Sequence, residues 1–231
     1  MGKLSIKQKT ILCYLVLALM FMLTGNSNNN PDPFIQRIFK PIKGENWAFY
    51  YAGLIVIIGT CYCLKYLNQI RENSFIRTTF RRIVMTLMLM DVSSNIWGFG
   101  NQIYKGFYND LNAIYLNREK TSVQLEGNEQ VINLDGVIVI KNQSHEIQTF
   151  QIKIKTPSFL RDLIQEEYIL LENEVTLYPK SIDNLYLNEE INISNKGQEQ
   201  SSYTTHAYEY ILFNEQNEVV FKGNATDYYL D

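Results

Sequence analysis

Histidine and cysteine are both scarce in this chain of 231 residues. Zinc sites need clustered His and Cys side chains, but the two histidines, His145 and His206, are far apart and have no cysteine near them. The three cysteines, Cys13, Cys61 and Cys63, all lie in apolar stretches of the N-terminal half, so no disulfide crosslinks the C-terminal half. We therefore expect no metal site, and we interpret Cys61 and Cys63 as buried small hydrophobic residues.

The chain also lacks the short motifs that carry catalysis or hold a nucleotide. It contains no Gly-x-Ser-x-Gly, no Gly-rich phosphate loop and no His-Glu-x-x-His. Acidic residues occur as neighbours, as in Glu189-Glu190, and neighbours on a strand point to opposite faces and cannot readily share a site. We predict a protein that is not an enzyme, with no catalytic residue and no cofactor.

Charge is divided unevenly along the chain. Residues 1–119 carry 13 Lys and Arg against 6 Asp and Glu, a net charge of +7. Residues 120–231 carry 8 against 18, a net charge of −10. A break of this size near Lys120 indicates two parts in two environments. The acidic C-terminal part argues against nucleic acid as a partner, because phosphate binding needs clustered Lys and Arg.

Long apolar runs are concentrated in residues 1–102, and they predict a transmembrane region in contact with the lipid bilayer. The first run follows a Lys-bearing N-terminus and is typical of a retained signal anchor. The second opens with aromatic residues suited to a membrane interface, and the third becomes polar halfway. The spans are expected at about residues 10–24, 47–67 and 83–100.

Polar and small residues recur every three or four positions in the third run, so they share one face of a helix. A carboxylate facing lipid is costly, and a polar, small-residue face packs well against another helix. We expect this face to be an interface with other membrane-protein subunits. The alternative is a helix lying on the membrane surface. The residues of this polar stripe are Asp91, Ser94, Asn95, Gly98 and Gln102.

Basic residues predict the orientation. The segment 65–82 carries five Lys and Arg against a single Glu72, so the positive-inside tendency places it, and the N-terminus, in the cytoplasm. With three spans the C-terminal domain is extracytoplasmic, and with two it is cytoplasmic. We predict three spans in an integral protein of the cell membrane.

Residues 103–120 are expected to form an amphipathic linker helix. Ile103, Phe107, Leu111 and Ile114 follow helical spacing, with tyrosines beside them. The helix would either continue from the third span as a stalk or lie along the membrane interface.

From Thr121 onward the apolar residues alternate, which predicts strands. Short strands with turn residues between them indicate an antiparallel sandwich over residues 121–231. The fold class is therefore an α+β membrane protein, with two or three N-terminal transmembrane helices followed by this β-sandwich. The strands are expected at 131–142, 149–156, 167–171, 174–178, 184–193, 206–213 and 218–222.

Four segments in this order, VIVIKNQS, TFQIKI, NEVTLYPKSIDNLYLNEEI and YEYILFNEQNEVVFKG, resemble bacterial immunoglobulin-like domains such as the C-terminal domain of FixG membrane proteins. The resemblance covers about residues 129–223 and implies an Ig-like β-sandwich. FixG proteins also carry cysteine clusters for iron–sulfur centres, which this chain lacks, so no electron-transfer activity is implied.

Tyrosines crowd the last residues of the chain, and exposed tyrosines are typical of binding surfaces. They are equally typical of half-buried strands. Tyr203, Tyr208 and Tyr210 are the candidates for a binding surface.

Taken together, the patterns favour a non-enzymatic accessory or assembly subunit of a larger membrane complex, with an extracytoplasmic β-sandwich as interaction domain. The alternative is a membrane-anchored sensor that binds a ligand through the β domain. A membrane enzyme or carrier working at Asp91 is a third interpretation, supported only by one intramembrane carboxylate.

Overall fold

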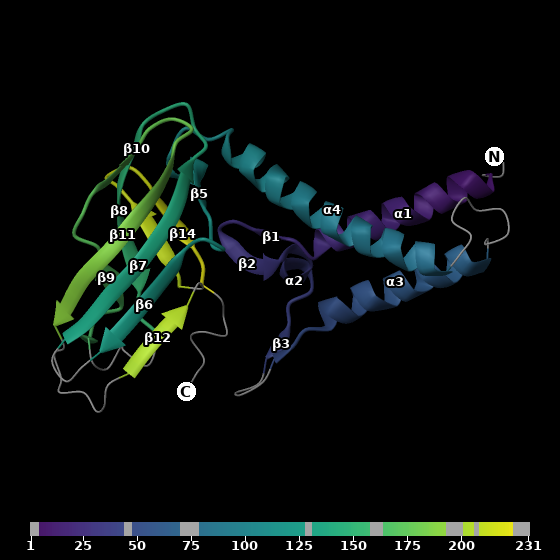
Figure 1. Ribbon diagram of the computed structural model, residues 1–231, viewed down its shortest axis with the longest axis horizontal. Coiled ribbons are helices and arrows are strands. Elements are labelled where there is room, and N and C mark those ends of the chain that lie inside the picture. The colour runs from purple at the N-terminus through teal and green to yellow at the C-terminus, as the bar shows by residue number, and fades with distance from the viewer. Residues whose placement is uncertain are drawn as a thin grey trace. The chain divides into compact units, whose positions relative to one another are not determined.

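The computed structural model describes residues 5–43, 48–69, 79–127, 131–157, 164–192, 201–205 and 208–223 (Figure 1). The chain divides into two compact units. The helical unit comprises Met1–Ser27 and Asp32–Gly100, and the β-rich unit comprises Asn28–Pro31 and Asn101–Asp231.

The helical unit is built around α1 (Ile6–Leu23), α3 (Tyr51–Gln69) and α4 (Thr79–Lys105), of which residues up to Gly100 belong to this unit. α1 begins with a capping box. The Ser5 side chain accepts a hydrogen bond from the Gln8 N–H, and the Gln8 side chain accepts one from the Ser5 N–H. Shorter elements lie between α1 and α3. They are β1 (Asn26–Ser27), β2 (Asn30–Pro33), α2 (Phe34–Ile38), β3 (Ile42–Lys43) and β4 (Ala48–Phe49).

Two of these helices, Ile6–Leu23 and Phe80–Lys105, are long and apolar enough to cross a membrane by length and composition. They correspond to the first and third predicted spans. The second predicted span coincides with α3, while its aromatic start at Trp47 lies outside the described residues.

Contacts at both ends show that α1 and α4 are parallel and that α3 is antiparallel to them. The Cys13 thiol of α1 lies 3.5 Å from the Cys63 carbonyl oxygen of α3. Arg82, near the start of α4, donates to Asn68 at the end of α3 at 3.0 Å. Trp97, near the other end of α4, donates from Nε1 to the Asn26 carbonyl oxygen at 2.7 Å, just beyond α1. The chain therefore runs up, down and up through this unit.

The β-rich unit contains two five-stranded antiparallel sheets that share one hydrophobic core. In one sheet the order is β11-β7-β6-β12, with β5 beside β6 on the same edge of β7. In the other the order is β10-β8-β13-β14, with β9 beside β10 on β8. The strands are β5 (Ile114–Leu116), β6 (Ser122–Gly127), β7 (Val131–Asn142), β8 (Gln148–Lys155), β9 (Tyr168–Leu170), β10 (Val175–Leu177), β11 (Ile182–Asn192), β12 (Ser201–Thr205), β13 (Tyr210–Phe213) and β14 (Glu218–Phe221).

Alternation decides which side chains enter the core. Phe150, Ile152 and Ile154 of β8 are fully buried, and Gln151 and Lys153 between them are more exposed. The predicted α+β class with antiparallel strands is confirmed. The alternation of apolar residues did not predict three strands that are short or polar, namely β5, β6 and β12.

The predicted amphipathic helix over 103–120 is wrong beyond its first turn. α4 ends at Lys105, and Gly106 follows with its N–H bonded to the Gln102 and Ile103 carbonyl oxygens. A 3-10 turn (Leu111–Ala113) and strand β5 come next. Leu111 and Ile114 are fully buried in the β-rich core, so their helical spacing reflects core packing and not a helix face.

Candidate functional site

The inner face of α4 is defined by residues at helical spacing that are buried or half-buried in the helical unit. Arg82, Thr86 and Ser93 are buried, and Leu89 packs against the cluster formed by α1 and α3. A helix turns by about 100° per residue, so Asp91 lies about 200° from Leu89. The polar stripe is thus on the opposite side of α4, away from α1 and α3.

Four residues of the stripe lie within the helical unit. Asp91, Ser94 and Asn95 are exposed, and an added Cβ at Gly98 would meet no atom within 4 Å. The Asn95 amide donates to the Asp91 carbonyl oxygen at 3.0 Å and lies 3.4 Å from its carboxylate oxygen Oδ2. These contacts stay within one turn of α4. Asp91, Ser94 and Asn95 therefore form an exposed polar surface, and the half-exposed Gly98 lies on the same face.

Gln102, the fifth predicted stripe residue, belongs to the β-rich unit. Its Oε1 accepts from the Gln143 amide at 3.3 Å, and it also bonds to Tyr115. Burial raises the pKa of the Tyr115 phenol, and this hydrogen bond partly offsets the rise. Gln102 therefore has a structural role inside the β-rich unit.

Two of the three candidate tyrosines are not on a surface. Tyr208 and Tyr210 are each 1% exposed and are part of the β-rich core. The prediction of a binding surface is wrong for these two residues, because strand alternation turns both rings inward. The side chain of Tyr203 lies outside the described part of the chain.

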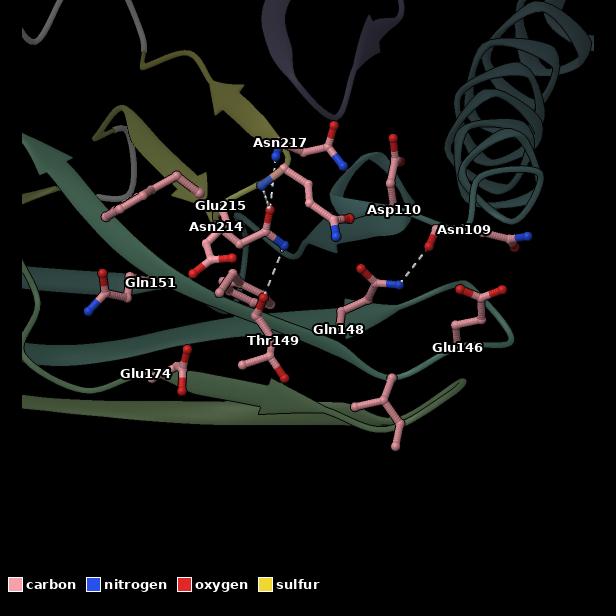
Figure 2. Close-up of a pocket in the computed structure, with 14 residues that line it drawn as sticks. Asn109, Asp110, Glu146, Gln148, Thr149, Gln151, Glu174, Asn214, Glu215 and Asn217 are labelled. Atoms are coloured by element: carbon pink, nitrogen blue, oxygen red, sulfur yellow. Dashed lines mark hydrogen bonds between the residues drawn. The ribbon is translucent and has the colours of Figure 1, made fainter.

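A pocket of about 740 Å³ opens at one end of the β8–β13 sheet, and the sequence alone did not suggest it (Figure 2). Its wall is formed by the start of β8, the turn before it, the β13–β14 hairpin, Glu174 before β10, and the turn after α4. Two hydrogen bonds fix the wall. Gln148 donates to the Asn109 carbonyl oxygen at 2.9 Å, and Asn214 donates to the Thr149 carbonyl oxygen at 3.2 Å.

Carboxylates and amides dominate this pocket. Asp110, Glu146, Glu174 and Glu215 line it, and the described lining residues include no Lys, Arg, His or Cys. Carboxylates favour cationic ligands, and amides favour ligands rich in hydroxyl groups. The lining residues come from separated turns of the sequence, which is why no linear motif marked the site.

Lys105 is a second feature that sequence reasoning missed. It lies beyond the apolar stretch 83–100 and is only 5% exposed within the β-rich unit. Its Nζ donates to the Asn112 carbonyl oxygen at 3.1 Å and lies 5.0 Å from the centre of the Phe221 ring. Burial lowers the pKa of Lys105 to about 7, and the Asp110 carboxylate opposes that shift.

Within the described ranges, no group of three or more His, Cys, Asp or Glu residues is arranged to hold a metal ion. No protein-family model, characterised protein or solved structure matches the chain. Among the described residues, the polar surface of α4 and the acidic pocket each offer a place where a partner or a ligand could bind.

Proposed function

We propose that the chain is a non-enzymatic accessory or assembly subunit of a larger membrane complex. It is integral to the cell membrane, with its N-terminus in the cytoplasm and the β-rich unit outside as an interaction domain. The observation that carries the proposal is the exposed polar surface of α4, formed by Asp91, Ser94, Asn95 and Gly98 on the side facing away from α1 and α3.

Membrane energetics explain why this surface needs a partner. A carboxylate near the middle of a span costs about 2.5–3.5 kcal/mol when it faces lipid. Within α4, Asp91 has the Asn95 amide as a neighbour, which compensates only in part. A polar side chain on a partner helix would complete the compensation, and Gly98 would let that helix approach closely.

The connections of the β-rich unit support three spans. Asn28 follows α1 by only a few residues and belongs to the β-rich unit, as does Asn101. Both ends of the intervening segment are then on one side of the membrane, so this segment crosses an even number of times. It contains α3 and α4, and a crossing by α4 requires a crossing by α3.

Basic and aromatic residues support the same orientation. The N-terminus and the segment 65–82 are basic, and the positive-inside tendency favours the cytoplasmic side for both. At the other end of α4, Tyr104 and Phe107 are 60% and 80% exposed, as expected of aromatic side chains at a membrane interface.

Strand order supports an Ig-like assignment of the β-rich unit. With β6, β7 and β11 taken as strands A, B and E, and β8, β13 and β14 as strands C, F and G, the two sheets hold the A, B, E and C, F, G strands of an immunoglobulin-like sandwich. The resemblance to the C-terminal domain of FixG proteins agrees with this order.

Leucine substitution of the stripe tests the proposal. The variant Asp91→Leu/Asn95→Leu should still insert and fold but should lose most of the membrane proteins that co-purify with the wild type in mild detergent. The matched control is Met90→Leu/Val92→Leu, which changes exposed apolar residues about 100° to either side of Asp91. Equal recovery of partners with both variants would contradict the stripe as the contact surface.

The acidic pocket favours a second candidate function, a membrane-anchored sensor. A ligand would enter between Glu146, Glu174 and Glu215, and the basic segment 65–82 would report to the cytoplasm. Calorimetric titration of the purified chain with spermidine tests the pocket. Binding that is lost in Glu146→Gln/Glu174→Gln supports this candidate, and absence of binding to the wild type removes a cationic ligand from consideration.

A further inference from the structure

Strand β11 lies at an edge of its sheet and is long for such a position. All eleven residues of Ile182–Asn192 pair with β7, and no strand in the described part of the chain pairs with the opposite side of β11. An edge of this length presents a row of backbone donors and acceptors to a partner.

Hydrogen bonds show which backbone groups face outward. The Asn142 N–H donates to the Ser181 carbonyl oxygen at 3.0 Å, so that pair is directed inward, toward β7. In an antiparallel ladder such pairs alternate, so the backbone groups of every second residue from Ile182 point away from β7. In agreement, the Asn184 N–H bonds to the Asp183 carboxylate at 2.8 Å. Tyr186, Asn188 and Glu190 follow in the same outward set.

The remaining edges are short or occupied. Asn29 covers part of β14, because its amide donates to the Val220 carbonyl oxygen at 3.2 Å and its own carbonyl accepts from the Lys222 N–H at 2.9 Å. β9 and β10 are three residues each, and β12 has five. Short and covered edges are how proteins prevent unwanted strand pairing, and β11 differs from them in its length.

The side chains of β11 define the partner that fits. Tyr186 is 82% exposed and Ile182 is 65% exposed, which provides apolar contact on the outward face. The strand carries Asp183, Glu189 and Glu190 and no Lys or Arg. Two copies of β11 pairing together would bring three carboxylates from each chain into one ladder, which like-charge repulsion disfavours. A basic segment would meet opposite charges instead.

We propose that the outer edge of β11 is a docking site for an extended, basic segment of a partner protein, which adds to the sheet as a further antiparallel or parallel strand. Backbone hydrogen bonds to the outward set would give affinity, and the exposed carboxylates of Asp183 and Glu190 would select Lys and Arg. The site deepens the proposed role of the β-rich unit as an interaction domain, and it is independent of the α4 stripe.

A peptide titration on the purified full chain in detergent tests this site. The probe is a fluorescent peptide in which Lys alternates with Thr, and its anisotropy reports binding. Asn188→Pro removes one outward N–H and leaves the inward pairing with β7 intact, since proline is tolerated on an edge strand when the lost N–H faces solvent. Binding should weaken about tenfold. Glu190→Lys should weaken it as well, whereas the matched charge change Glu166→Lys, at an exposed position before β9 and outside the acidic pocket, should not.

Two further measurements separate strand addition from its rivals. A version of the peptide with methylated backbone nitrogens keeps its charge but cannot pair, so equal binding of this version would overturn the proposal in favour of simple charge attraction. Sedimentation of the purified chain checks for a dimer. A dimer that dissociates in Asn188→Pro would mean that β11 pairs with a second copy and would also overturn it. Unchanged thermal unfolding of Asn188→Pro is required as the folding control.

Discussion

A buried cation is unusual in a small β domain, and Lys105 is one within the β-rich unit. Its ammonium has one carbonyl oxygen, Asn112 O, and the face of Phe221 as neighbours, and burial lowers its pKa to about 7 from 10.5. Between these two values the unfolded chain binds more protons than the folded chain. The stability of the β-rich unit should therefore rise with pH in this window and fall toward pH 7.

This linkage predicts a measurable slope. From about pH 7.5 to 9.5, Lys105 should add about 1.4 kcal/mol to the free energy of unfolding per pH unit. Urea unfolding of the full chain in detergent, followed by tyrosine absorbance at each pH, measures it. Lys105→Met should flatten the slope, while Lys120→Met, at an exposed position, should keep it. A slope that is the same in wild type and Lys105→Met would show that Lys105 is not the titrating group.

At Gly136 both the backbone conformation and the close approach of β6 restrict the residue. Its φ of 149° lies in a region that favours glycine, and a Cβ there would overlap the Ser122 carbonyl oxygen of β6. Gly136→Ala should destabilise the β-rich unit by about 2–4 kcal/mol, from backbone strain and displacement of β6. Thermal unfolding measures this. Gly98→Ala on α4, where an added Cβ meets nothing, is the matched control and should leave the midpoint unchanged or slightly higher. A Gly136→Ala midpoint as high as wild type would contradict the assigned backbone conformation.

At the scale of elements, the sequence predicted what depends on regular spacing. β7 was predicted with the bounds it has, because VINLDGVIVIKN is long and bounded by polar residues. β12 is Ser201–Thr205, whose composition resembles a loop, and it is held by pairing with β6. Pairing between distant segments supplies what such a strand lacks in hydrophobicity, and pairing is not visible in local sequence.

The candidate sites also differed in how far the sequence could predict them, because some depend on local spacing and others on contacts between distant segments. Helical spacing placed Asp91, Ser94, Asn95 and Gly98 on one face of α4, since that depends only on the helix repeat. Gln102 continued the spacing but packs within the β-rich unit. Tyr208 and Tyr210 could not be assigned to a surface or to the core without knowing which face of β13 is covered. The acidic pocket depends on tertiary packing of separate turns, so no local pattern encoded it.

At the scale of the whole molecule, the short segment Asn28–Pro31 after α1 belongs to the β-rich unit, so it connects the membrane region to that unit early in the chain. The side chain of Asn28 both accepts from the Leu116 N–H at 2.9 Å and donates to the Leu116 carbonyl oxygen at 2.6 Å. This pairing satisfies both backbone groups of a residue in β5. Asn28→Ala should cost about 1–3 kcal/mol in the unfolding free energy of the β-rich unit, measured by urea unfolding. Asn133→Ala, an exposed amide on β7, is the control and should cost much less.

The same connection makes the side of the membrane testable. In a variant with all three cysteines replaced, single cysteines are introduced as Ile38→Cys after α1, Phe80→Cys at the start of α4 and Glu215→Cys in the β13–β14 hairpin. Intact cells are treated with a membrane-impermeant thiol reagent. With three spans, Ile38→Cys and Glu215→Cys should label together, and Phe80→Cys should label only after permeabilisation.

If Ile38→Cys labels and Glu215→Cys is protected, α4 does not cross the membrane. Asn28 then cannot remain within the β-rich unit, and the proposed extracytoplasmic role of that unit fails. Asn28–Pro31 and Asn101–Asp231 form one compact unit, and Ile38 follows Pro31 by only seven residues, so we expect Ile38→Cys and Glu215→Cys to respond alike in every condition.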